Sequence, residues 1–252
     1  MRPDLIADLF EKEGTYWWNV AKREIVLALA NTVAGQPERR TLAIGVDIGC
    51  GPGFTTKVFD RNWRMVGADI SRDALDFCKS RGLRNLCRID MTDFSLPFKT
   101  NSIDLVLALD VIEHVEDDIH ALTECHRILK TGGLLIVTVP AFMALWSPWD
   151  ESLGHKRRYT SPQLLYALRK VGFAVARSTY IFFFVFPAAI LIRRVKGFFQ
   201  KDARTYSSDF MPLPGIINRF LVGLGHLEQW MTTKLNLRFP FGLSVISVAR
   251  KK

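Results

Sequence analysis

Short apolar runs alternate along residues 41–181 with segments whose apolar residues recur every three or four positions. Apolar runs bounded by polar residues are typical of buried strands, and the wider spacing is typical of helices that cover a sheet. The alternation predicts an α/β fold built on a doubly wound, Rossmann-like sheet of about seven strands. The expected strands are TLAIGVDIG, RMVGADI, LCRID, SIDLVLALD, GLLIVTVP, FAVARSTYI and, near the C-terminus, SVISVAR.

Three of the expected helices have recognisable ends. SRDALDFCKSRGL predicts a helix that is capped by Ser71 and stops at Gly82. Residues 113–130 place their apolar side chains on one face and run into a pair of glycines, which predicts a second helix. In SPQLLYALRKVGF, Ser161 is the expected cap and Pro162 the expected first residue of a third helix.

The whole chain, 1–252, is expected to form one domain with an N-terminal lid and a late insertion. Trp17 and Trp18 lie in the lid, where they either close over the site or pack on an edge of the sheet. The four expected parts are a helical lid (1–40), a core (41–180), a basic aromatic insertion or cap (181–240) and a last strand (241–252).

Charge is divided unevenly between the two halves of the chain. Residues 1–154 contain 17 Lys/Arg and 22 Asp/Glu, whereas residues 155–252 contain 17 Lys/Arg and 3 Asp/Glu. The basic half indicates either an anionic partner, such as nucleic acid or lipid headgroups, or a solvated basic face. The four cysteines lack the spacing of a disulfide framework, and the N-terminus lacks the apolar stretch of a secretory signal. We therefore expect a cytoplasmic protein.

The stretch VDIGCGPGF, residues 46–54, carries glycine at every second position directly after the first apolar core run. Glycine permits positive φ and lets a ligand approach the backbone N–H groups. The nicotinamide fingerprint GxGxxG fails because Phe54 stands where the third glycine would fall. The pattern is DxGxGxG instead, and Asp47 ahead of the glycines suits a ligand with a cationic ammonium group better than a pyrophosphate.

With these motifs in order, residues 40–180 resemble class I S-adenosylmethionine-dependent methyltransferases, in the small-molecule branch that resembles ubiquinone and menaquinone biosynthesis methyltransferases. SVISVAR fits the antiparallel last strand of that fold, preceded here by a helical insertion. The resemblance implies that S-adenosylmethionine is the cofactor and that the protein is an enzyme that transfers its methyl group.

The resemblance also implies which residues hold the cofactor. Asp47 and the loop of Gly49, Cys50 and Gly51 would lie beside the methionine moiety, with Cys50 a small filler and not a nucleophile. Asp69, at the end of the second strand, would accept the ribose hydroxyls, although aspartate also favours strand-end turns for structural reasons alone. The remaining implied contacts are Ile70 on the adenine face, Asp90 and Met91 on the adenine edge, and Leu109 on the methionine amine.

The motif DVIEHV, after the fourth expected strand, offers one set of candidate catalytic residues. Asp110 and Glu113 have the spacing of a helix capping box, and His114 follows at the end of the sheet where ligands bind. DxxEH also resembles the ExxEH metal site of methyltransferases that act on catechol-like rings or RNA ends. A metal-assisted O-methyltransferase is therefore an alternative, but aspartate has a shorter reach than glutamate and we assign no metal ligand.

The motif GHKRRYT, after the fifth expected strand, offers a second set. His155 is a candidate general base together with His114, because imidazole accepts a proton near neutral pH. Arg157 and Arg158 could form a fork for a phosphate or carboxylate, and Tyr159 an aromatic wall. The alternative is a basic surface turn in which His155 is hydrogen-bonded to the backbone.

The run YIFFFVFPAAILI, residues 180–192, is uncharged but shorter than the roughly 20 residues that span a bilayer. Arginine and lysine follow it within 181–201, a composition typical of a helix that lies in a membrane interface. Alternatively, residues 181–186 continue the sixth strand into the core and the rest of the run forms a helical cap that closes the acceptor pocket. Either arrangement suits a small-molecule or lipid-linked acceptor, with a membrane surface as the partner in the first case.

Two further functions are disfavoured. A nucleic-acid methyltransferase could use the basic half, but the fourth strand ends in LALDV instead of an NPPY-like turn, and no Pro-Cys pair offers a thiolate. A non-catalytic partner protein with the same fold would have no use for an intact glycine loop and strand-end carboxylates. Nucleic acid is therefore not an expected partner.

Overall fold

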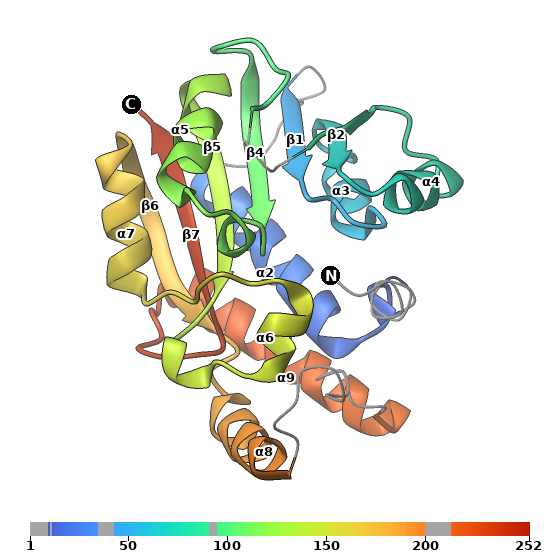
Figure 1. Cartoon of the computed structure of the whole chain (residues 1–252), viewed down its shortest axis with the longest axis vertical. Coiled ribbons are helices and arrows are strands. Elements are labelled where there is room, and N and C mark those ends of the chain that lie inside the picture. Colours follow the sequence, from blue (N-terminus) through green and yellow to red (C-terminus); the bar gives the residue numbers. More distant parts are fainter. Residues whose placement is uncertain (1–9, 11, 35–42, 91–94, 200–212) are drawn as a thin grey trace.

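The computed structural model describes residues 10, 12–34, 43–90, 95–199 and 213–252. A seven-stranded sheet in the order β3-β2-β1-β4-β5-β7-β6 runs through the molecule (Figure 1). β7 is antiparallel to both of its neighbours, β5 and β6, whereas β1 to β5 pair in parallel. The strands are β1 (Ile44–Ile48), β2 (Arg64–Asp69), β3 (Leu86–Arg88), β4 (Ile103–Leu109), β5 (Leu129–Pro140), β6 (Phe173–Ile181) and β7 (Ser244–Lys251).

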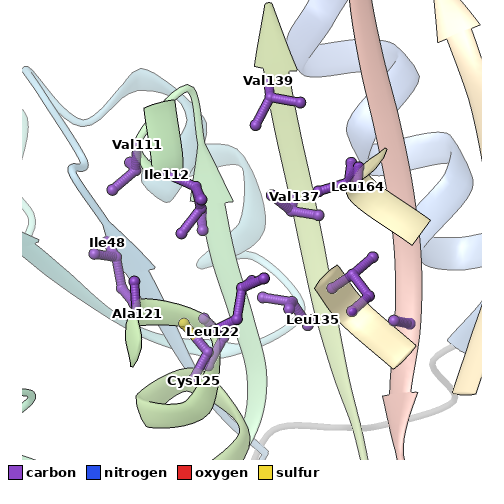
Figure 2. Packing of buried hydrophobic residues seen from close by; sticks show 14 of the residues in the cluster. Ile48, Val111, Ile112, Ala121, Leu122, Cys125, Leu135, Val137, Val139 and Leu164 are labelled. Atoms are coloured by element: carbon purple, nitrogen blue, oxygen red, sulfur yellow. The ribbon is translucent and has the colours of Figure 1, made fainter. Parts of the chain in front are cut away.

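Helices cover both faces of this sheet because alternate residues of each central strand point to opposite sides. Along β4, Val106 and Ala108 join one hydrophobic core, which includes residues of α5 and α7, while Leu105 and Leu107 join a second core with α2. Figure 2 shows the first core. The helices are α2 (Trp17–Ala34), α3 (Phe54–Phe59), α4 (Arg72–Ser80), α5 (Asp118–Ile128), α6 (Pro148–Leu153), α7 (Ser161–Lys170), α8 (Phe186–Phe199) and α9 (Gly215–Thr233), with 3-10 turns η1 (Ile112–His114) and η2 (Met143–Leu145).

The predicted α/β sheet with an antiparallel last strand and a helical insertion before it is confirmed. The cap of α4 is also as expected, since the Ser71 hydroxyl accepts a hydrogen bond from the Ala74 N–H at 3.3 Å. The cap of α7 lies one residue earlier than predicted. Thr160, not Ser161, forms a capping box with Gln163.

The segment after β4 departs most from the sequence prediction. The expected helix over 113–130 is shorter, because α5 begins at Asp118 and its cap is Asp117, whose carboxylate accepts from the His120 N–H at 2.9 Å. The expected capping box of Asp110 and Glu113 is wrong. Asp110 has a left-handed backbone with φ 54°, and Glu113 lies within the short turn η1.

The apolar run 180–192 does not form one continuous element. β6 ends at Ile181, and Phe182 turns the chain with φ 64°, so α8 starts only at Phe186. The carboxylate of Glu228 in α9 accepts from the N–H groups of Phe182 at 2.5 Å and Phe183 at 3.1 Å, which secures the turn. The interpretation that the strand continues to Phe186 is therefore wrong. Among the described residues, no helix has the length and apolar character needed to cross a membrane.

The sheet and the insertion meet at one end of the molecule. The arrowheads of β1 and β4 point downward in Figure 1, toward α6, α9 and α8. Ligands bind beyond the carboxyl ends of the strands in open α/β sheets. The glycine loop after β1, the turn after β4 and the loop after β5 therefore open toward the same region.

Candidate active site

The glycine loop is held open by contacts with the neighbouring strand. Gly49 and Gly51 have φ of +67° and +52°, conformations that a residue with a Cβ rarely adopts. The Gly49 N–H donates to the Ala68 carbonyl at 2.8 Å, and the Gly51 N–H donates to the Asp69 carboxylate at 2.9 Å. These bonds fix the loop between the ends of β1 and β2.

A cavity of about 190 Å³ lies against this loop. Most of its walls come from the loop itself and from α2, and Leu109 at the end of β4 closes one side. The cavity brings together five residues of the predicted cofactor set, from β1, the glycine loop after it and the end of β4. The lining residues are Phe10, Glu13, Asn19, Lys22, Asp47, Gly49, Cys50, Gly51, Pro52, Thr55 and Leu109.

Two carboxyl groups make this cavity acidic. Asp47 is buried and accepts a hydrogen bond from the Thr56 hydroxyl at 2.6 Å. Burial raises the pKa of Asp47 to about 7. The nearby charge of Asp69 also raises this pKa, whereas the hydrogen bond from Thr56 lowers it. Burial and the charge of Asp47 likewise raise the pKa of Glu13 to about 7. A bound cation would favour the ionised form of both carboxyl groups.

Three other described residues of the predicted cofactor set do not line the cavity: Asp69 ends β2, Ile70 follows it, and Asp90 follows β3. Asp69 holds the loop through Gly51, and its second oxygen accepts from the Ser71 N–H at 2.8 Å. Ile70 is 45% exposed, which leaves its side chain available for a flat ligand surface. Asp90 is exposed after β3, and Met91 lies outside the described residues.

The residues present fit S-adenosylmethionine. The ligand's ammonium and sulfonium groups are cationic, and the cavity provides two carboxyl groups, Glu13 and Asp47, beside exposed backbone. A Cβ built on Gly51 would stand 3.6 Å from Oε2 of Glu13, so a larger residue would take up space in the cavity. Asp69 and Ile70 follow at the end of the neighbouring strand, where a ribose and an adenine would continue from the methionine end.

The turn after β4 is tied to the N-terminal helix. Lys22 of α2 forms an ion pair with the carboxylate of Asp110, which also accepts from the Thr138 hydroxyl at 2.8 Å. The backbone N–H of Asp110 donates to the Thr138 carbonyl at 3.0 Å. These contacts fix Asp110 in its left-handed conformation and direct its side chain toward α2. The Asp110 carboxylate is therefore held between Lys22 and Thr138.

The loop after β5 contains a buried ion pair that positions His155. Asp150 in α6 accepts from Nε and Nη2 of Arg158 at 2.8 and 3.0 Å, and its Oδ1 lies 2.8 Å from Nδ1 of His155. Against the opposing effect of burial, the contacts with His155 and Arg158 lower the pKa of Asp150 to about 2. The carboxylate therefore stays ionised and orients the His155 ring through Nδ1, which leaves Nε2 for another partner.

The predicted anion fork of Arg157 and Arg158 is not supported by their contacts. Arg158 is buried against Asp150, and Arg157 donates to the carbonyls of Val115 at 3.2 Å and Glu116 at 2.6 Å. Tyr159 is buried as well, and its hydroxyl donates to Asp118 at 2.8 Å. Arg157 and Tyr159 hold the loop after β5 against the segment after β4, and Arg158 braces the loop internally through Asp150 and the Ala141 carbonyl.

Those two loops bring Glu113, His114 and His155 together. Their ligand atoms all lie within 4.8 Å of one another, and the two imidazole rings meet edge to face with centroids 4.8 Å apart. Burial, followed by the proximity of His155, lowers the pKa of His114 to about 4, so His114 is neutral at pH 7. Burial and the charge of Asp110 raise the pKa of Glu113 well above its ordinary range. Asp110, expected in this cluster, is replaced by His155.

Sequence reasoning did not identify Glu13, Lys22 or Asp150. Glu13 and Lys22 come from the N-terminal segment and reach a loop more than 25 residues further along the chain, so no local spacing links them to it. Asp150 lies five residues before His155, a separation without a fixed geometry in a loop. Trp17 and Trp18, expected as lid or edge residues, pack on Phe182 and do not line the cavity.

Comparisons with known proteins agree with this geometry. Residues 46–137 match the family model described as a methyltransferase domain. A probable S-adenosylmethionine-dependent methyltransferase of Mycolicibacterium smegmatis is 27% identical over 177 residues, which cover 68% of this chain and 64% of that protein. A ubiquinone biosynthesis O-methyltransferase of Cereibacter sphaeroides is 34% identical over 95 residues, which cover 36% of this chain and 38% of that protein. The matches thus span less than two thirds of each of these relatives.

Solved structures share the fold across nearly the whole chain. A putative sarcosine dimethylglycine methyltransferase from Galdieria sulphuraria matches with a TM-score of 0.60 and 16% identity, covering 93% of this chain and 86% of that one. A putative methyltransferase of Haloferax volcanii, solved with the Trm112 methyltransferase activator, matches with a TM-score of 0.58 and 17% identity, covering 95% and 92%. Taken with the glycine loop and the strand order, the family model and the relatives show that residues 46–137 form a methyltransferase domain of the class I, S-adenosylmethionine-dependent type, and the solved structures show that its fold extends over nearly the whole chain.

Proposed function

We propose that this protein transfers the methyl group of S-adenosylmethionine to a small-molecule or lipid-linked acceptor at the cytoplasmic face of a membrane. The observation that carries the acceptor class is the surface of α8 and α9, which lie at the same end of the molecule as the carboxyl ends of β1 and β4 (Figure 1). Where the structure describes the side chains of these helices, seven large apolar ones are between 42% and 80% exposed. They are Leu191, Ile192, Ile216, Ile217, Phe220, Leu227 and Trp230.

Basic residues accompany these apolar side chains. Arg219 in α9 is exposed, and Lys234 and Arg238 are exposed just after it. Apolar side chains can enter the acyl boundary of a bilayer while neighbouring cations contact anionic headgroups. A lipid-linked acceptor held in that surface would present its polar end to the strand ends, where the cofactor cavity lies.

The chain's own residues supply binding, orientation and proton removal. S-adenosylmethionine supplies an electrophilic methyl group on its sulfonium. The glycine loop with Asp47 and Glu13 would hold the methionine end, and Asp69 the ribose. When the acceptor carries a proton on the attacking atom, His155 or His114, which meet beside Glu113, would remove it.

A transfer assay with methyl-labelled S-adenosylmethionine tests the activity and the acceptor class together. The purified protein is incubated separately with a detergent-dispersed membrane lipid extract, an aqueous metabolite extract and total RNA. Label in a lipid or a small molecule is the expected result. Label in none of the three pools, or in RNA alone, would contradict the proposal.

Vesicle co-sedimentation tests the membrane surface separately. Wild-type protein should sediment with vesicles of phosphatidylglycerol and phosphatidylethanolamine at low salt, and a Phe220→Ser/Trp230→Ser double variant should sediment much less. Tyr166→Ser is the matched control, because Tyr166 is 68% exposed on α7, outside the α8 and α9 surface. Equal sedimentation of the double variant and wild type would exclude these two side chains as the membrane contact.

A further inference from the structure

We propose that Asn218 of α9 is a positioning residue for the cofactor cavity, because it holds the wall that the N-terminal segment contributes. Both ends of its side-chain amide bind the backbone of that segment. Oδ1 accepts from the Trp17 N–H at 2.9 Å, and Nδ2 donates to the Thr15 carbonyl at 3.0 Å, across 201 and 203 residues of sequence. The inference rests on cofactor binding in the cavity and not on the class of acceptor.

The N–H of Trp17 is a group that its own helix leaves without a partner. α2 begins at Trp17, and the first N–H groups of a helix have no acceptor within the helix. A Ser, Thr, Asp or Asn directly before the helix usually accepts from such groups. The residue there is Tyr16, whose hydroxyl stands at the far end of a ring. Asn218 therefore supplies from another helix a hydrogen bond that the local sequence does not.

The bridged groups form a joint in the cavity wall. Glu13 lines the cavity from the segment before this joint, and its carboxyl group faces the glycine loop. Asn19 and Lys22 line the cavity from α2, after the joint. An amide that binds the backbone on both sides of Tyr16 fixes the direction in which the first segment leaves the helix. Asn218 thus sets where Glu13 lies relative to the other two side chains.

Other contacts next to the joint are less directional. The Glu13 carbonyl accepts from Nη1 of Arg23 at 3.4 Å, which is long for a hydrogen bond. Gly14 packs against the ring of Phe54, a contact without a preferred direction along the ring face. These contacts limit how far the wall can move, whereas the two bonds of Asn218 define its position.

The helix that carries Asn218 is itself fixed to the core. Gly225 packs against Ala21 of α2 with no room for a Cβ between them, and both residues are buried. The Glu228 carboxylate accepts from two backbone N–H groups directly after β6. α9 is therefore held by α2 and by the sheet, and Asn218 presents its amide from a stable support.

Calorimetric titration of S-adenosylmethionine tests the role of this amide. Asn218→Ala should weaken binding about fivefold to tenfold, because the cofactor-free wall then spends less time in the arrangement that binds. Asn218→Gln carries the same donor and acceptor and should recover part of the lost affinity. His226→Gln is the matched control, because it removes an exposed contact of α9 with Glu24 of α2 and should bind as wild type does.

Exchange of the Trp17 backbone amide tests the hydrogen bond directly, in protein without cofactor. In Asn218→Ala this amide should exchange about tenfold faster than in wild type, while amides in the middle of α2 keep their rates. A merely structural role would increase exchange along all of α2 and would leave the cofactor affinity of the folded protein unchanged. That result would contradict the proposal.

Unchanged cofactor affinity in Asn218→Ala, or an equal loss of affinity in His226→Gln, would also overturn the proposal. If Asn218→Ala fails to fold, Asn218→Ser, whose side chain is too short to bridge both backbone groups, decides the same comparison. Intact cofactor binding by wild type without methyl transfer to any acceptor would count against the proposed function alone.

Discussion

The backbone N–H of Gly51 donates a hydrogen bond to Oδ2 of Asp69 across 2.9 Å, which joins the glycine loop after β1 to the end of β2. Oδ1 of the same carboxylate accepts from the Ser71 N–H at 2.8 Å. A carboxylate offers about four lone-pair directions, so each oxygen can accept a further hydrogen bond. Asp69 can therefore shape the loop and bind a ribose at the same time.

Asp69→Ala should weaken S-adenosylmethionine binding at least tenfold, about 1.4 kcal/mol or more, because it removes both the loop contact and the ribose acceptor. The affinity of Asp69→Asn for S-adenosylmethionine should lie between those of wild type and Asp69→Ala, because the amide oxygen can still accept a hydrogen bond. Calorimetric titration measures the three affinities. Asp76→Ala, with a side chain 66% exposed on the neighbouring α4, is the control and should bind normally. Unchanged binding by Asp69→Ala would remove Asp69 from the cofactor site.

Gly53 and Gly82 form a matched pair for testing packing around the loop. Both have positive φ, +83° and +85°, but a Cβ on Gly53 would lie 2.6 Å from Sγ of Cys78, whereas a Cβ on Gly82 has nothing within 4 Å. Gly82→Ala should cost about 1 kcal/mol from backbone strain alone. Gly53→Ala should cost about 1–3 kcal/mol more. Denaturant unfolding measures both, and equal losses would show that Cys78 and Leu83, whose Cδ1 would lie 2.7 Å from the new Cβ, move aside freely.

Asp47 should make the stability of the cofactor-free protein depend on pH. Its pKa of about 7 is raised from 3.8, so between about pH 4 and 7 the folded chain keeps a proton that the unfolded chain releases. The unfolding free energy then falls as pH rises through this window, by at most about 1.4 kcal/mol per pH unit from this group. Asp47→Asn should flatten this slope in urea unfolding at successive pH values. Equal slopes of unfolding free energy against pH for wild type and Asp47→Asn would contradict the raised pKa of Asp47.

The Asp150–Arg158 ion pair should contribute far more to stability than an exposed pair. Asp150→Asn leaves Arg158 buried without its counter-charge and should cost about 3 kcal/mol. The low pKa of Asp150, about 2 against 3.8, means that its contribution is complete above about pH 4 and lost as pH falls toward 2. Urea unfolding across this range should therefore show less acid sensitivity in the variant. Asp76→Asn, which affects an exposed pair with Lys79, should change stability by less than about 1 kcal/mol.

Trp18 and Phe182 should be energetically coupled. Their rings are stacked with centroids 3.8 Å apart and an interplanar angle of 18°, which joins α2 to the turn after β6. A double-mutant cycle of Trp18→Ala and Phe182→Ala should give a coupling of about 1 kcal/mol in thermal or denaturant unfolding. Additive losses would show that the two rings contribute independently and that α2 is held by its other contacts.

Local sequence patterns were sufficient for the sheet and for the cofactor loop. The expected strand FAVARSTYI coincides with β6, and β2, β3, β4 and β7 agree with their predictions within two residues at both ends. β1 starts three residues later than expected, and β5 starts four residues earlier, at Leu129. DxGxGxG located the loop because positive φ and close backbone approach require glycine at fixed positions. Such constraints act between neighbours in the chain, so they are visible in a linear sequence.

Only the tertiary structure decided which side chains share a site. Asp110 pairs with Lys22, 88 residues away, and Glu113 lies beside His155. The three-residue spacing of Asp110 and Glu113 in DVIEHV therefore suggested a pairing of the two that the structure does not contain. Arg158 turned out to be a buried partner of Asp150 and not an anion ligand. Hydrogen bonds and ion pairs depend on the distance between side chains in space and on how far water is excluded from them. Both are set only when the fold brings the ends of β1, β4 and β5 together. The sequence therefore determined the scaffold and its glycine loop, and the packed loops determined the charges and partners of the residues around Glu113 and His155.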